Sequence, residues 1–326
     1  FIVGMFIKRI RKFFPPMVTG TVIFTVGLSL YKVALNYMAG GFQPTDPRYG
    51  GLVYWGIAVL TLVVVLICNM FGKGIVKLSS ILIGIVVGYV ASLFAGIVSF
   101  APIGEASWVT LPQILPYKLE FPIAGIVAIG IMFIVNLVQD VGQLSGTAVG
   151  GMDREATEEE IAGGVKVNGL VSVLGAFIGA LPTSSFGQNV GIVAMTKVVS
   201  LKVIRITAGL LLLAGLTPKF AGLMTSIPQC VIGGATISVF AQITMTGIKL
   251  ITLDEMSIRN TTIVGLGVAL GMGITQIPVE GLQYFPEWFT MVFASSPVVL
   301  AATVVFVLNI IIPPKSIQEE EAERQA

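Results

Sequence analysis

Charged residues are scarce in this chain, and histidine is absent. Of 326 residues, 11% are charged (19 basic and 17 acidic), whereas 55% are hydrophobic and the mean hydropathy is +0.94. A water-soluble domain carries about a quarter charged residues, so the composition indicates a membrane protein. The lack of histidine excludes a Ser-His-Asp triad, a His-ligated metal and a histidine-ligated haem.

Cysteine is also rare. Cys68 and Cys230 both lie in apolar runs, so they offer neither a disulfide framework nor a metal cluster and are expected to be small buried hydrophobic residues. The net charge is +2, and the basic residues are spread over short loops and do not gather on one face. This pattern gives no support for nucleic-acid binding. We expect no metal site and no cofactor.

Long apolar runs make up most of the chain. A helix needs about 20 mainly apolar residues to cross the hydrocarbon layer. The expected spans are Met17–Ala39, Gly51–Phe71, Ile75–Phe100, Phe121–Thr147, Ile161–Leu181, Val203–Leu216, Ile227–Ile248, Thr261–Ile277 and Trp288–Ile312. The apolar piece from Asn189 to Leu201 is too short to cross alone. We therefore expect an all-α polytopic membrane protein.

Basic residues are distributed unevenly between the expected loops. If the cluster Lys8–Lys12 is cytoplasmic, most Lys and Arg residues fall on the inner side, and Arg48, Lys118 and Lys219 lie in outer loops. By the positive-inside rule, this distribution predicts a cytoplasmic C-terminus in the cell (plasma or inner) membrane. The Glu-rich end, 316–326, is expected to be a solvated tail.

One expected span carries a polar stripe. At 100° per residue, its polar positions fall on one helix face about 100° wide. These positions are Asn136, Gln139, Asp140, Gln143 and Thr147. Such a stripe must face protein or water, and a carboxylate at this depth is a candidate proton or cation carrier. The alternative is that the stripe only bonds neighbouring helices.

A second polar feature interrupts the apolar pattern. Pro182 ends the preceding helix, and the small polar residues up to Gly187 indicate extended chain. Helix resumes near Gln188 or Asn189. Non-helical backbone at membrane depth is tolerated where protein or a polar cavity satisfies it, and a broken helix of this kind is typical of a transporter's binding site.

The residues after this break resemble a known signature. Gln188 to Lys197 reads QNVGIVAMTK, which is similar to the signature of the nucleobase-ascorbate transporters, also called nucleobase:cation symporter-2 or xanthine/uracil permeases. That signature has ten positions. They are Gln, Glu or Pro, then Asn, then any residue, then Gly, then four residues of any type, then Thr, and last Arg, Lys or Gly. Gly191, Thr196 and Lys197 occupy its later fixed positions. Phe14–Gly20 and Leu216–Phe220 also resemble segments of this family.

The resemblance implies a fold of fourteen segments in two inverted seven-segment repeats, with a short extended strand before a half-helix at mid-membrane. By this map the chain begins near the end of the fourth segment and lacks the first three, so we expect that it cannot transport alone. The implied parts are 1–13 (end of a core helix), 14–116 (gate, three helices), 117–218 (core), 219–314 (gate, three helices) and 315–326 (cytoplasmic tail). Dimerisation through gate helices is implied too. Gate glycines, including Gly265, Gly267 and Gly271, are expected to serve close helix packing.

Two positions depart from the family pattern. Gln139 stands three residues before Gly142, where the family has a substrate-contacting, ion-coupling Glu, and Gln143 stands where relatives carry His or Asp. An amide can bond a purine edge but cannot carry a proton. We therefore expect Asp140 to be the ionisable coupling residue, with H⁺ or Na⁺ as the coupled ion and Gln143 as a second ion-coupling candidate.

Gln188 resembles the purine members of the family more than the uracil members, which favours an oxopurine such as xanthine or urate over uracil. Guanine and uracil are the alternative substrates. We expect Gln139 and Gln188 to clamp the ring edge, with Asn189 either fixing the turn or contacting the substrate through Gln188. Backbone N–H groups at Phe186 and Gly187 are expected to bind the carbonyl oxygens of the base. Lys197 is expected to satisfy the terminal carbonyls of the half-helix.

Other functions fit the sequence less well. A sulfate-permease-type anion transporter would share the broken helices but needs no pair of amides that reads a base edge. An intramembrane hydrolase needs a second buried carboxylate beside Asp140, and no other acidic residue lies deep in an expected span. A scaffold bundle explains neither the helix break nor the stripe, so we expect a transporter and not an enzyme.

Overall fold

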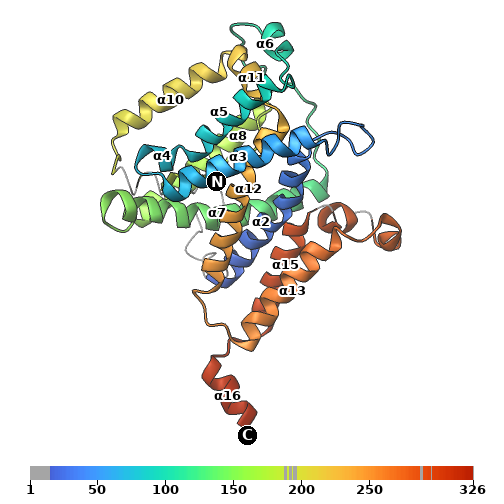
Figure 1. Ribbon diagram of the computed structural model, residues 1–326. Coiled ribbons are helices and arrows are strands. Elements are labelled where there is room, and N and C mark those ends of the chain that lie inside the picture. Colours follow the sequence, from blue (N-terminus) through green and yellow to red (C-terminus); the bar gives the residue numbers. More distant parts are fainter. Residues whose placement is uncertain are drawn as a thin grey trace. The chain divides into compact units, whose positions relative to one another are not determined.

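The structure is a computed structural model that describes residues 15–186, 189–190, 193, 197–286, 289–294 and 296–325 (Figure 1). Within these residues it is helical, and no β-strand is assigned. In chain order the elements are α2 (Pro16–Met38), α3 (Leu52–Phe71), α4 (Ile75–Leu78), α5 (Ser80–Phe94), α6 (Ala101–Glu105), α7 (Ile123–Met152), α8 (Glu158–Phe177), α10 (Leu201–Gly215), α11 (Pro218–Thr225), α12 (Gln229–Ile251), α13 (Ile258–Ile274), η2 (Val279–Leu282), η3 (Thr290–Ala294), α15 (Pro297–Ile311) and α16 (Ile317–Gln325). The expected all-α class is confirmed; the inverted repeat stays a prediction.

Several helices meet the requirements of a membrane span. The helices α2, α3, α8 and α12 are long and apolar enough to cross a bilayer, and α10 with α11, bent by 81°, forms a further candidate. The helices α5, α13 and α15 are apolar but shorter. Large side chains along α3 are exposed, among them Leu52 and Phe71, as expected for a surface that faces lipid. The chain is therefore a multi-pass membrane protein.

Two expected spans are interrupted. The run from Ile75 to Phe100 divides at Ser79, whose ψ of 14° separates α4 from α5. Gly96, with φ +68°, then follows the end of α5. The run from Trp288 begins with the π-helix η3, and α15 starts only at Pro297, because the proline ring cannot continue a preceding helix.

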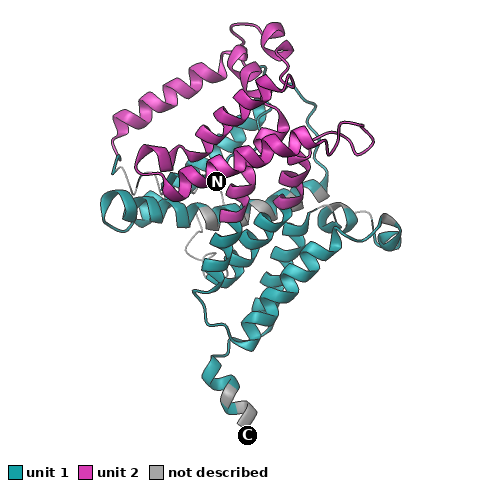
Figure 2. Cartoon of the chain, viewed as in Figure 1, with its two compact units in different colours: residues 1–29, 113–198, 243–326 teal, residues 30–112, 199–242 magenta. Residues whose placement is uncertain are grey.

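The chain forms two compact units (Figure 2). Unit 1 comprises Phe1–Ser29, Gln113–Val198 and Ile243–Ala326, and unit 2 comprises Leu30–Pro112 and Val199–Gln242. The core and gate domains expected from the sequence divide the chain at other positions. Because core and gate are defined by relative motion, that division stays a prediction.

Glycines bring two helices of unit 1 close together. A Cβ atom on Gly271 would lie 2.5 Å from the Pro297 carbonyl oxygen, and one on Gly267 would lie 2.1 Å from Val305 Cγ2. Real Cβ atoms do not make such contacts, so α13 and α15 depend on glycine at these points. The packing role is confirmed for Gly267 and Gly271. It is wrong for Gly265, beside which a Cβ atom would meet open space.

Unit 2 has its own apolar core. On α5, a Cβ atom on Gly84 would lie 2.3 Å from Val65 Cγ2, and one on Gly88 would lie 2.2 Å from Thr61 Oγ1, so α3 and α5 also pack through glycine. The buried cluster beside this contact contains Met38, Ile57, Ala58, Cys230 and Val231. Cys230 is thus a core residue, as expected, whereas Cys68 is only half-buried.

Candidate functional site

The polar stripe lies on one continuous helix, α7, in unit 1. Asp140 is 3% exposed, and Asn136 is half-buried. The Thr147 hydroxyl donates to the Gln143 backbone carbonyl at 2.8 Å, and Gln143 Oε1 is buried without a hydrogen-bond partner among the described residues. The side chain of Gln139 lies outside the described residues. Asp140 is therefore the buried ionisable group of the stripe.

A helix break lies in the predicted stretch, but the preceding helix ends four residues before Leu181, where the sequence predicts that Pro182 ends it. The helix α8 ends at Phe177, and Gly179 follows with φ +72°. A Cβ atom there would lie 2.5 Å from Pro116 Cγ, so the turn requires glycine. Residues 180–186 are not helical, and helix resumes at Asn189, whose N–H donates to the Phe186 carbonyl at 3.0 Å.

Asp140 joins this non-helical stretch to two helices. Its Oδ2 accepts a hydrogen bond from the Asn168 side-chain amide on α8. Its Oδ1 accepts from the Ser185 backbone N–H at 3.2 Å and from the Ser185 hydroxyl. Three donors thus compensate one buried carboxylate, as such a group requires.

A second row of bonds fixes these donors. The Thr183 hydroxyl donates to Asn168 Oδ1 at 2.7 Å and lies 2.9 Å from Ser172 Oγ, which accepts from the Thr183 N–H at 3.1 Å. The Ser184 hydroxyl donates to Asn136 Oδ1. The stretch is therefore held by side chains of α7 and α8 in place of a sheet ladder, which satisfies backbone that a helix would otherwise pair.

Sequence reasoning missed Asn168, Ser172 and Thr183. Asn168 and Ser172 lie four residues apart and so share one face of α8, and Asn168 is an amide in an otherwise apolar run. The same argument that identified the stripe on α7 could have found this pair. Thr183 carries no such signal, because its role depends on the path of the non-helical chain.

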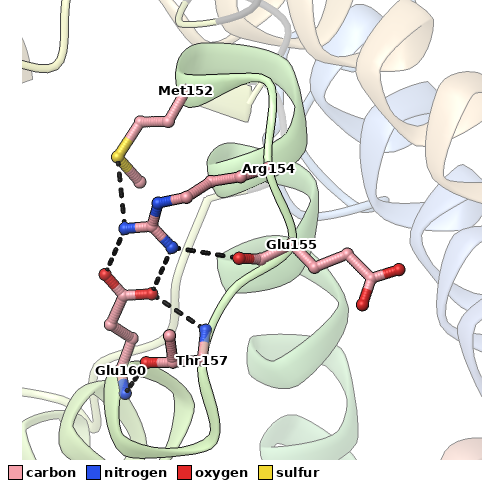
Figure 3. Close-up of polar contacts among 5 residues, drawn as sticks. All are labelled: Met152, Arg154, Glu155, Thr157 and Glu160. Atoms are coloured by element: carbon pink, nitrogen blue, oxygen red, sulfur yellow. Dashed lines mark hydrogen bonds and ion pairs between the residues drawn. The ribbon is translucent and has the colours of Figure 1, made fainter.

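The loop between α7 and α8 sets the direction in which α8 returns (Figure 3). Arg154 binds both carboxylate oxygens of Glu160, at 2.8 and 2.6 Å, and donates to the Glu155 carbonyl at 3.0 Å. Glu160 and Thr157 form a capping box at the start of α8. The bond to Glu160 raises the pKa of Arg154. This local network helps to place Asn168 opposite Asp140.

Lys197 has a partner that the sequence did not indicate. Its ammonium donates to Asp153 Oδ1 at 2.6 Å, and Asp153 is the left-handed C-cap of α7, with φ 53°. The pair connects the end of the polar-stripe helix to the residue that follows the broken helix. Both side chains are largely exposed, so the pair contributes little stability on its own.

Part of the predicted site lies outside the described residues. Gly187, Gln188, Gly191 and Thr196 are among those positions. Phe186 is 56% exposed, and Asn189 is also exposed. The part of the chain that the structure describes holds no group of three or more Cys, Asp or Glu residues that could bind a metal ion.

Comparisons with known proteins identify relatives. A family model described as the permease family, with xanthine and uracil permeases in its short name, matches residues 1–280. The xanthine permease XanQ of Escherichia coli K12 is 32% identical over 93% of this chain and 66% of its own length. The xanthine permease of Bacillus subtilis is 34% identical over 98% of this chain and 73% of its own length. The uric acid permease PucK of B. subtilis is 37% identical over 84% of this chain and 64% of its own length. The chain thus spans about two thirds of the length of these relatives.

Proposed function

The chain belongs to the nucleobase-ascorbate transporter family of xanthine and uracil permeases, and we propose that the full-length protein transports nucleobases by secondary active transport. The observation that carries the proposal is the buried junction around Asp140, where α7, α8 and the non-helical stretch 180–186 meet. A broken helix beside a polar helix face provides both fixed backbone groups and side-chain amides for a polar ligand. The same bonds also join α7 to α8, so the uptake assay decides between a binding site and helix packing alone.

The substrate we propose is an oxopurine such as xanthine or urate. Oxopurines present carbonyl oxygens and ring N–H groups, and carboxamides can pair with both. Gln139 and Gln188 are the proposed clamp on the ring edge, and the N–H groups of Phe186 and Gly187 are the proposed donors to its carbonyl oxygens. Support comes from the relatives, which are named for xanthine and uric acid.

We propose coupling to H⁺ or Na⁺ through Asp140. Its carboxylate is buried and is tied to the stretch that leads into the half-helix. A change in its charge would therefore alter the hydrogen bonds that hold the binding stretch, which is a direct way to couple an ion to substrate affinity. The proposed orientation places the C-terminus in the cytoplasm, from the distribution of Lys and Arg.

Uptake of radiolabelled xanthine into proteoliposomes that contain the full-length protein tests the proposal. We expect uptake that urate reduces and that sulfate or bicarbonate does not, since those anions would be substrates of a sulfate-permease-type transporter. No xanthine uptake, or competition by sulfate, would refute the proposal.

The same assay tests the coupling residue. Asp140→Asn should abolish the pH or Na⁺ dependence of uptake, whereas Asp46→Asn, which removes a loop carboxylate, should leave it unchanged. If Asp140→Asn preserves both the uptake rate and its ion dependence, Asp140 is not the coupling residue.

A further inference from the structure

In unit 1, the loop between α12 and α13 lies at the start of α2, the start of α13 and the end of α15. The helix α16 leaves the α13–α15 pair at this point (Figure 1). Arg259, near the start of α13, donates from Nε to the Ile312 carbonyl at 3.0 Å and from Nη2 to the Asn309 carbonyl at 2.9 Å. It thereby satisfies carbonyls at the C-terminal end of α15, where a cation is favourable. The same cation stands at the N-terminal end of α13, where it is unfavourable.

A carboxylate from α16 compensates this position. Glu320 accepts the backbone N–H of Ile258 at 2.7 Å with Oε2 and that of Arg259 at 2.9 Å with Oε1. Ser257 is the N-cap residue of α13, and its hydroxyl accepts the Asn260 N–H at 3.3 Å. Glu320 thus pairs the first two N–H groups of α13, which have no partner within their own helix. Residues 317–319 and 322 are exposed, in line with the solvated tail that the sequence predicts, and α16 is in addition bound through the Glu320 side chain.

The α12–α13 loop also accepts a hydrogen bond from α16. The N–H of Ile317, the first residue of α16, donates to Glu255 Oε2 at 3.2 Å. The neighbouring Asp254 accepts the N–H of Met17, at the start of α2, at 2.7 Å. A cleft of about 550 Å³ at this junction is lined by Met17, Asp254, Arg259 and Lys315 among others. The ends of α2, α13, α15 and α16 are therefore connected through charged hydrogen bonds.

We propose that α16 is an intramolecular clamp that holds the start of α13, and through Arg259 the end of α15, to the loop at Asp254 and Glu255 as one rigid group, and that the transport rate depends on it. The role in transport rests on the proposed function, because secondary transporters move one rigid group of helices against another. Without Glu320, the N–H groups of Ile258 and Arg259 lose their acceptor, and only the Ser257 bond to Asn260 still caps the first turn of α13. Fraying of this turn would then release Arg259 from the carbonyls of α15.

Glu320→Gln in the full-length protein tests the clamp. A glutamine offers one oxygen and turns an N–H group toward the second backbone N–H, so at least one bond is lost. Glu321→Gln makes the same change of charge at the next position and is the matched control. The first readout is hydrogen exchange of the Ile258 and Arg259 amides, which we expect to become about tenfold faster in Glu320→Gln, the equivalent of one charged hydrogen bond.

The second readout is xanthine uptake per molecule of protein. We expect Glu320→Gln to lower the maximal rate per molecule of folded protein about twofold or more and to leave the KM unchanged. The folded fraction is measured by size exclusion, because loss of folded protein would also lower the maximal rate without changing the KM. Equal exchange in Glu320→Gln and Glu321→Gln would overturn the clamp. Faster exchange with an unchanged maximal rate would overturn its role in transport. The exchange experiment needs no substrate, so it is decided even if the protein does not transport purines.

Discussion

Exchanging the two side chains of the Asp140–Asn168 pair probes the buried network directly. In Asn168→Asp, the donor to Asp140 Oδ2 is replaced by a second carboxylate at hydrogen-bonding distance. The change removes a hydrogen bond to a charged group, worth about 1.5–3 kcal/mol, and adds repulsion between two buried carboxylates. We expect a total loss of roughly 3 kcal/mol in the free energy of unfolding at neutral pH.

The double variant Asp140→Asn/Asn168→Asp should recover this loss. An amide at position 140 can accept from Ser185 with its oxygen and donate to the carboxylate at position 168. The other oxygen of that carboxylate takes the place of Asn168 Oδ1, which accepts from the Thr183 hydroxyl at 2.7 Å. Every bond of the network is thus restored with donor and acceptor exchanged, and we expect a stability within about 1 kcal/mol of the wild type.

Thermal unfolding of the full-length protein in detergent, followed by fluorescence-detected size exclusion, measures the effect. A loss of about 3 kcal/mol corresponds to a fall of roughly 6 °C or more in Tm, at about 2 °C per kcal/mol. The exchanged pair should return most of this fall. If the double variant is no more stable than Asn168→Asp, the two side chains are not coupled and the network is wrong.

Two further predictions concern packing and charge. Gly271→Ala should destabilise the protein by about 1–3 kcal/mol, because its Cβ atom would overlap the Pro297 carbonyl, whereas Gly265→Ala, beside open space, should be neutral or slightly stabilising; equal Tm values would contradict the packing. The hydrogen bond from Arg48 lowers the pKa of Asp46 from 3.8 to about 2, so the loop contact is fully present above pH 4 and lost as the pH falls through about 2. Arg48→Ala should raise the NMR titration midpoint of Asp46 toward 3.8 but not fully to it, because the backbone N–H at position 48 still donates to Asp46 Oδ1 at 2.9 Å. An unchanged midpoint would exclude the Arg48 side chain as the cause.

Much of the fold could be predicted because spans depend on apolar length, which is a local property. The run Gly51–Phe71 became α3 with a difference of one residue at its start. The break at Ser79 could not be predicted, since neither Ser79 nor Ser80 forbids helix and no proline marks the position. The close packing of α5 on α3 at Gly84 and Gly88 is likewise a tertiary contact that apolar length does not encode.

The candidate site was predictable in outline for the same reason. Periodicity placed Asp140 on a polar face, and Pro182 indicated the break. The partners of Asp140 depend on how α8 returns beside α7, which the loop at Arg154 and Glu160 controls and which no helical period encodes. Asn168 could be identified from the sequence as a polar position, but its bond to Asp140 is evident only once the two helices are seen together.

The most direct test of the account is equilibrium binding of tritiated xanthine to the purified full-length protein. Gln139→Leu removes an amide proposed to hold the ring edge, and Gln113→Leu changes an exposed glutamine in a loop as the control. We predict at least about tenfold weaker binding in Gln139→Leu, since an unpaired polar group on a bound ligand costs about 1–3 kcal/mol, with no change in Gln113→Leu. Equal affinity in the two variants would contradict the claim that the polar face of α7 binds a nucleobase.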